Sequence, residues 1–179
     1  LEKHTSNING MKYDYYISSE LSSFDLIINL PKFKTHSLMT FTGAVKNLFG
    51  LLPGNSKRIL HYRLPEQKDF AKFLPDLYQE INPQLSIMDA VWALEGDGPG
   101  ASGIRKQMGL ILASDNGIAL DIVCSRLMNI HPQEVPINSV AITQNYYKED
   151  YSDIEILGED IMDCIDKSYL LPNTHHYNN

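Results

Sequence analysis

A long basic segment without acidic residues is the feature of this sequence with the most obvious chemistry. Residues 26–65 contain no Asp or Glu, although these make up 22 of the 179 residues of the chain. The same segment holds six of the 15 Lys and Arg residues and two of the six His residues, namely Lys32, Lys34, His36, Lys46, Lys57, Arg58, His61 and Arg63. A solvated basic face is the simplest explanation of such a cluster. The complete exclusion of acid favours a site that keeps a positive potential for an anionic ligand.

Within this segment, imidazoles and amines stand close to glycine and hydroxyl residues. Two imidazoles, His36 and His61, together with the amine of Lys46, are suited to proton transfer, anion binding or metal binding. Val45 and Phe49 would form the apolar side of a short helix, which leaves Lys46 free for a ligand. Taken alone, a single His is more often a surface or hydrogen-bonded residue. The residues expected to bind the ligand are Lys32, Lys34, Thr42, Gly43, Asn47 and Lys57.

Two carboxylates, Asp89 and Glu95, are the acidic candidates for ligand binding. Asp89 follows apolar Met88 in an expected strand, and a buried carboxylate needs a partner. Glu95 opens the glycine-rich segment 95–103, which matches neither a dinucleotide fingerprint nor a phosphate-binding loop. A tight turn is the ordinary meaning of such a segment. Glu95 would meet the basic segment if both lie at the same edge of a sheet.

Composition limits the function classes. Hydrophobic residues make up 43% and charged residues 21%, and the net charge is −7, which argues against nucleic acid or an acidic membrane as the partner. Cys124 and Cys164 are the two cysteines, so the chain forms no zinc ribbon or iron–sulfur cluster by itself, and we expect a reducing, cytoplasmic location. No apolar run approaches the ~18 residues of a membrane span. The sequence opens on Leu1 rather than Met, so we expect a fragment of a longer protein.

The basic segment follows an apolar run that resembles a buried strand. Phe24–Leu30 is nearly continuously apolar and ends at Pro31, which predicts a buried, parallel strand. We expect residues 31–40 to be a loop at the carboxyl end of that strand, where open α/β sheets bind ligands. Thr42 is expected to cap a short helix that ends before Gly50.

The remaining pattern alternates strands with helices. Strands are expected at 12–18, 84–91, 109–113 and 154–157, and helices at 70–81, 117–129, 136–144 and 159–167. Pro75 predicts a kink in the first of these helices, or its division into two. The sequence therefore predicts an α/β fold with a mainly parallel sheet and helices on both faces. We expect a single domain over residues 1–169 and a loose polar tail over 170–179.

Four segments resemble the domain of unknown function 362 family. They are Asp25 to His36 (DLIINLPKFKTH), Thr42 to Gly50 (TGAVKNLFG), Glu95 to Pro99 (EGDGP) and Ser114 to Asp121 (SDNGIALD). The resemblance implies a poorly characterised prokaryotic protein, often fused to a ferredoxin-like segment that binds two 4Fe–4S clusters. The chain lacks the cluster cysteines, so any such cluster would belong to a fused or partner segment.

A second resemblance concerns the order of four groups, His36, Gly43-x-x-Lys46, Pro53-Gly54 and His61, which is similar to the core of nickel-pincer lactate racemases. That resemblance implies a nickel-pincer nucleotide tethered by Lys46, with His61 as nickel ligand and His36 as an acid/base group. The double glycine that precedes the racemase lysine is replaced here by Gly-Ala-Val, and the paired upstream histidines have no counterpart.

Two hypotheses follow. The first is an enzyme or ligand-binding domain that holds a small anionic or nucleotide-type ligand in the basic segment 31–63. The second is a non-catalytic accessory module that docks on an iron–sulfur electron-transfer partner of acidic surface. A concave pocket lined by His36, Lys46 and His61 would favour the first. We also expect Lys32, Lys34 and Lys46 to converge, and an anion to bind at the start of the Thr42 helix.

Overall fold

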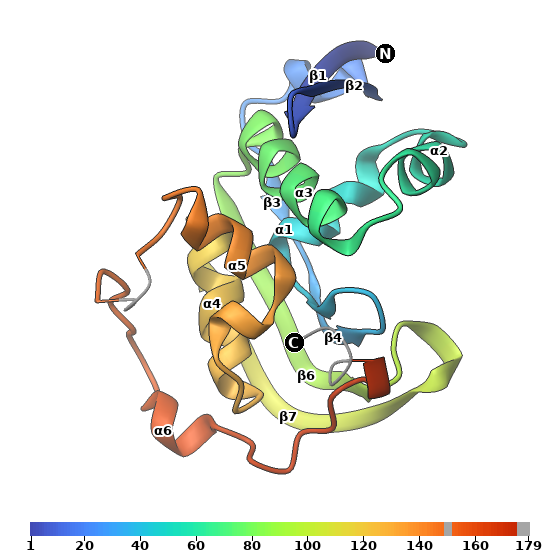
Figure 1. Cartoon of the computed structure of the whole chain (residues 1–179). Helices are drawn as coiled ribbons and strands as arrows, with labels where there is room; N and C mark the ends of the chain where they lie inside the picture. Colours follow the sequence, from blue (N-terminus) through green and yellow to red (C-terminus); the bar gives the residue numbers. More distant parts are fainter. Residues whose placement is uncertain (149–151, 175–179) are drawn as a thin grey trace.

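Five strands form a mixed sheet in the computed structural model (Figure 1). The longest strands are β6 (Leu85–Gly96) and β7 (Gly103–Ser114), which pair antiparallel as one hairpin. β3 (Ile28–Asn29) and β4 (Lys32–His36) follow each other along the opposite side of β6 and run parallel to it. β5 (Thr40–Thr42) pairs antiparallel with β4.

Helix α4 (Gly117–Leu127) is the central helix of the structure, which describes residues 1–148 and 152–174. Leu120 and Cys124 pack towards the sheet, whereas Ile122 belongs to the apolar cluster around α3 (Gln67–Ile81). Cys124 is fully buried, as expected for a core residue. α4 therefore lies between the sheet and the other helices. The α/β class is confirmed, with one compact domain.

The other helices are short. They are α1 (Ala44–Asn47), α2 (Ser56–Arg63), α5 (Pro136–Thr143), α6 (Ile161–Cys164) and the 3₁₀ helices η1 (Ser19–Ser23), η2 (Leu48–Leu51), η3 (Gly100–Ser102) and η4 (Pro132–Glu134). α5 packs beside α3 and α4 (Figure 1). α2 was not expected, because the polar sequence around it shows no clear apolar face.

The amino-terminal hairpin of β1 (Glu2–Ile8) and β2 (Met11–Ile17) forms a separate two-stranded sheet. It packs on α3, where the ring of Tyr15 meets Phe73 edge-on at 5.1 Å between centroids. Residues 12–18 were expected as a strand, but β1 was not, because its alternation is mostly polar.

Three expectations about secondary structure are wrong. Of the apolar run Phe24–Leu30 only β3 pairs, and Phe24, Leu26, Ile28 and Leu30 are 47–68% exposed, so the run is not buried. The expected loop 31–40 contains β4 and the start of β5. Residues 154–157 form no strand. For Pro75 a kink or a division of the helix was expected; α3 continues through it as one helix, so the division is not found.

One face of the sheet carries exposed apolar side chains. Ile28 and Leu30 share this face with Ile111. Ile111 is 69% exposed and is the β7 residue that pairs with Asp89 of β6. Trp92 is 43% exposed and is covered by the guanidinium of Arg105 at 5.0 Å. α4 packs on the opposite face of the sheet.

The segment after α6 returns to the sheet. Leu170 N–H donates to Glu95 at 3.0 Å and the carbonyl of Leu170 accepts from Gly96 N–H at 2.7 Å. Asn173 donates to Asp97 from both its backbone N–H and its side-chain amide. Of the tail expected at 170–179, Leu170 and Asn173 are thus hydrogen-bonded to the glycine-rich segment. Residues 175–179 lie outside the described residues.

Candidate functional site

A cationic cavity of about 220 Å³ lies where β4, α1, η2 and α2 meet. It is lined by Lys32, Lys34, His36, Thr42, Gly43, Lys46, Asn47, Phe49, Gly50, Lys57 and Pro99. Four lysines and one histidine thus face one small space, and none of the lining residues is acidic. The expected convergence of Lys32, Lys34 and Lys46 is therefore found in the structure.

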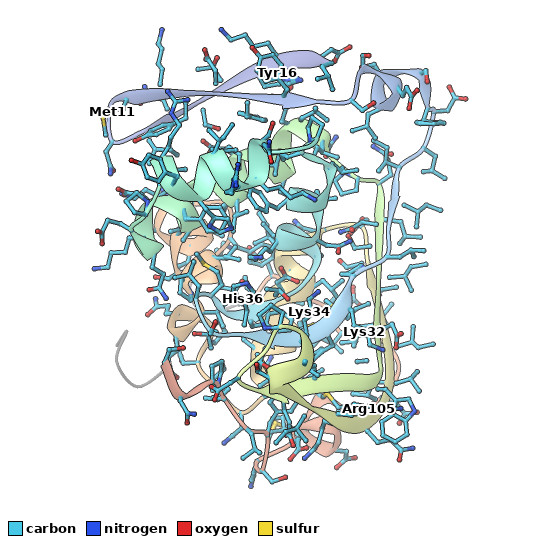
Figure 2. All side chains as sticks on the ribbon, turned by 90° about the vertical axis from the view of Figure 1, so that its right-hand side faces the viewer. Met11, Tyr16, Lys32, Lys34, His36 and Arg105 are labelled. Carbon is cyan, nitrogen blue, oxygen red and sulfur yellow. The ribbon has the colours of Figure 1, made fainter. Side chains whose placement is uncertain are left out.

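The alternation of β4 determines which side chains reach the cavity. Phe33 and Thr35 are fully buried, whereas Lys32, Lys34 and His36 are half-buried on the other side of the strand. Figure 2 shows Lys34 and His36 beside each other, with Lys32 nearer the edge of β6 and β7. Successive side chains of a strand point to opposite faces, so the spacing Lys-x-Lys-x-His brings the three polar groups to one side.

A buried carboxylate holds α1 in place. Asp121 on α4 is 2% exposed and accepts hydrogen bonds from Ala44 N–H at 2.6 Å and Val45 N–H at 3.0 Å. A Cβ at Gly43 would overlap this carboxylate, so glycine is required there. The pKa of Asp121 is raised to about 7, because the effect of burial exceeds the opposite effect of the two N–H donors, which favour the ionised carboxylate.

The start of α1 offers an anion fewer donors than expected, and the anion site there stays a prediction. Thr42 does not cap the helix. The N-cap residue is Gly43, which has no side chain that could accept a hydrogen bond. The N–H groups of Ala44 and Val45 already bind Asp121. An anion in the cavity must be held by side chains instead.

His36 presents a hydrogen-bond donor to the cavity. Its Nδ1 accepts from Leu38 N–H at 3.1 Å and more weakly from Met39 N–H at 3.4 Å. Burial, and then the charges of Lys46, His61 and Lys34, lower the pKa of His36 to about 3. The ring is therefore neutral at physiological pH. Because Nδ1 is an acceptor, the ring proton sits on Nε2.

Lys46 is a half-buried cation of the cavity. Its Nζ lies 5.9 Å from the centre of the Phe49 ring, and no carboxylate in the described residues pairs with it. Burial, and then the charge of Lys34, lower the pKa of Lys46 to about 8. A substantial fraction of this amine is neutral at mildly alkaline pH, which is unusual for lysine.

His61 lies close to the cavity but does not line it. Its ring packs on Phe70 at 4.2 Å and on Phe49 at 5.3 Å between centroids. Burial and Lys46 lower its pKa. Across residues 1–148 and 152–174, no three His, Cys, Asp or Glu side chains come together in a way that could hold a metal ion. His61 as a metal ligand stays a prediction.

The two acidic candidates lie elsewhere. Asp89 is exposed rather than buried, and its carboxylate binds Lys32 Nζ at 2.8 Å on the open face of the sheet. That hydrogen bond lowers the pKa of Asp89. Glu95 is 7% exposed and lies 3.7 Å from Lys106 Nζ, beside the returning segment. Neither residue is among those that line the cavity.

Two contributors were missed. Asp121 orders α1 from a position 77 residues away in sequence, and its only signal is a carboxylate among apolar helix residues. The glycine-rich segment approaches β4: Ser37 N–H donates to Gly98 at 2.8 Å, and Pro99 lines the cavity. Gly98 leaves no room for a Cβ against Thr35, which explains the glycine.

Sequence comparison places this site within a known family. The family model described as Domain of unknown function (DUF362) matches residues 2–126, which include every residue that lines the cavity. The chain belongs to the DUF362 family. Thylakoid-associated protein sll1697 of Synechocystis sp. is 38% identical over 121 residues, which cover 67% of this chain and 37% of that protein. The DUF362 chain thus matches little more than a third of that relative's length.

The comparisons give no support to the resemblance with nickel-pincer lactate racemases. No solved structure matches the chain. In the part of the chain that the structure describes, no helix has the length and apolar character needed to cross a membrane.

Proposed function

We propose that this DUF362 domain binds a small anion in the cavity between β4, α1 and α2. The observation that carries the proposal is the lining itself, which contains four lysines and a neutral histidine donor but no acidic residue. Lys32 is neutralised by Asp89, so Lys34, Lys46 and Lys57 are the cations left for a ligand. Charge-assisted hydrogen bonds from amines are strong when the pocket excludes water.

The size of the cavity limits the ligand. Pockets for drug-sized ligands measure roughly 300–1,000 Å³, so about 220 Å³ favours a phosphate, sulfate or small carboxylate over a whole nucleotide. A larger cavity of about 550 Å³ lies between β7, α4 and residues 154–164, but apolar side chains dominate its lining. The cationic cavity is therefore the better candidate for anion binding.

Docking on an acidic, ferredoxin-like partner remains the second hypothesis. Arg58 and Arg63 are exposed on α2 and extend the positive surface beyond the cavity. A partner protein would contact these arginines, whereas a small anion bound in the cavity would not need them. Substituting both arginines therefore distinguishes the two hypotheses.

The test is calorimetric titration with sulfate and with phosphate at low ionic strength. We expect Lys34→Gln and Lys57→Gln each to weaken binding about tenfold, the value of one charge-assisted hydrogen bond. Lys12→Gln, on an exposed position of β2, is the matched control and should bind as the wild type does. Absence of binding to the wild type at tens of millimolar, or equal affinity in all three variants, would refute the proposal.

A further inference from the structure

We propose that Lys46 forms an imine with an anionic carbonyl compound held in the cationic cavity, either a 2-oxo acid or a phosphorylated aldehyde or ketone. The inference rests on the proposed function, because the cavity must first bind the anionic group. It goes further by assigning Lys46 a covalent role and by naming a carbonyl as the second feature of the ligand.

The first support is the isolation of the Lys46 amine from countercharge. Three carboxylates around the site have other partners: Asp121 binds the backbone of α1, Asp89 binds Lys32, and Glu95 lies beside Lys106. An amine that forms an ion pair stays protonated and cannot attack a carbonyl. Lys46 is half-buried, unpaired within the described residues and next to Lys34, so its pKa falls to about 8. A lysine activated by burial and a neighbouring cation is the known requirement for imine formation.

The second support is the donor that the cavity offers to a carbonyl oxygen. His36 lines the same cavity, and its Nδ1 is fixed as an acceptor by Leu38 N–H. The neutral ring therefore offers Nε2–H, which can hydrogen-bond an oxygen that gains negative charge during attack. His36 and Lys46 both line this cavity of about 220 Å³, so both can contact one ligand bound there.

The third support is that an anionic group would still find cations after Lys46 has lost its proton. Lys34 and Lys57 line the cavity and form no ion pair with a carboxylate of the described residues. They would hold the carboxylate or phosphate of the ligand and direct its carbonyl towards Lys46. About 220 Å³ accommodates a molecule of this size.

The step balances without an added oxidant or reductant. The ammonium of Lys46 gives up a proton, and the free Nζ lone pair attacks the carbonyl carbon while the C=O electron pair moves to oxygen. That oxygen, hydrogen-bonded by His36 Nε2–H, is protonated from solvent, and the carbinolamine forms. The hydroxyl then receives one further proton and leaves as water. The nitrogen lone pair forms the C=N bond, and the protonated imine remains. In sum, one ammonium and one carbonyl give one iminium and one water.

The experiment is reductive trapping. The chain is incubated with pyruvate or with glycerone phosphate, reduced with sodium cyanoborohydride, and analysed by intact mass and peptide mapping. We expect one adduct per chain, located at Lys46, with a trapping rate that rises as pH approaches and passes 8. Lys46→Arg keeps the charge but cannot form an imine, and should give no adduct, while Lys12→Arg should be trapped as the wild type is. An adduct with pyruvate would identify a 2-oxo acid as the ligand, and an adduct with glycerone phosphate would identify a phosphorylated carbonyl compound.

Two further outcomes separate this inference from the proposed function. If the wild type binds sulfate but neither carbonyl compound is trapped at Lys46, the imine is refuted and anion binding stands. If sulfate does not bind either, the proposed function itself fails. Adducts spread over many lysines would also refute the inference. Mapping on the wild type decides the question even where Lys46→Arg does not fold.

Discussion

Lys46 and His36 owe their charge states to the same arrangement. Each is half-buried, and each faces the positive charge of Lys34. Burial and like charge both disfavour protonation. The imidazole of His36 is therefore neutral throughout the physiological pH range, whereas the amine of Lys46 titrates near pH 8, just above that range. His36 is thus a constant donor, and Lys46 is the group of this pair whose charge responds to mild alkali.

The burial of an unpaired amine should reduce stability. We predict that Lys46→Met raises the free energy of unfolding at pH 7 by about 1–2 kcal/mol. The pKa of Lys46 is lowered in the fold, so the unfolded chain binds more protons between pH 8 and 10.5, and wild-type stability rises with pH across that window. The advantage of the variant should therefore shrink between pH 8 and 10.5.

Urea denaturation at pH 7, 9 and 10.5 measures this effect. Lys12→Met, exposed on β2, is the control and should follow the wild type. A Lys46→Met variant that is less stable than the wild type at pH 7 would mean that Lys46 has a stabilising partner.

At the scale of elements, the contact between α4 and α1 organises the site. α1 has four residues and cannot be stable alone, since isolated helices need about 12–15 residues. Asp121 supplies the acceptors for its first N–H groups, and Gly43 allows the close approach. The position of Lys46 thus depends on a residue of another helix.

We predict that Asp121→Ala lowers the free energy of unfolding by about 2–4 kcal/mol, because two buried N–H groups lose their acceptor. The pKa of Asp121 is raised in the fold, so the contribution of this carboxyl is largest at low pH and falls as pH rises from 3.8 to about 7. Guanidinium denaturation at pH 5 and pH 8 should show the larger loss at pH 5. Asp163→Ala, at an exposed position of α6, should change stability by less than about 0.5 kcal/mol.

Elements were predictable where the signal is local. The apolar spacing of α3 and α4 identified both helices, because it depends on residues within a few turns. The run Phe24–Leu30 was misread, since its composition does not tell which face another part of the chain will cover. In the site, convergence of the lysines was expected from a cationic loop after Pro31. The structure brings Lys32 and Lys34 to one side through the alternation of β4, a strand that was not expected. The role of Asp121 was not predictable, because its pairing with α1 arises only when two distant segments pack.

At the scale of the whole molecule, the uncovered face of the sheet dominates the surface. Leu30 and Ile111 are 68% and 69% exposed on the same face of β3, β6 and β7. Exposed apolar side chains on one face of a sheet are candidates for a contact area or for association. We predict that Ile111→Lys reduces concentration-dependent association of the isolated chain, with a change in unfolding free energy of less than about 1 kcal/mol.

Sedimentation velocity over a range of protein concentrations measures the association. Met11→Lys, at a position 57% exposed on β2 of the separate two-stranded sheet, is the matched control and should associate as the wild type does. Equal sedimentation of Ile111→Lys and the wild type at every concentration would show that the face takes no part in association.

The acid-free lining of the cavity also has a consequence for how a ligand arrives. The chain carries a net charge of −7, whereas four of its 15 Lys and Arg residues and no acidic residue line the cavity. The positive potential at the cavity attracts an anion that is already close to it. The net negative charge of the chain repels the same anion at larger distances. Salt weakens both fields, with a Debye length of about 8 Å at physiological ionic strength. Added salt therefore weakens both the long-range repulsion of the anion and its attraction inside the cavity. The association rate should then change less with ionic strength than the dissociation rate.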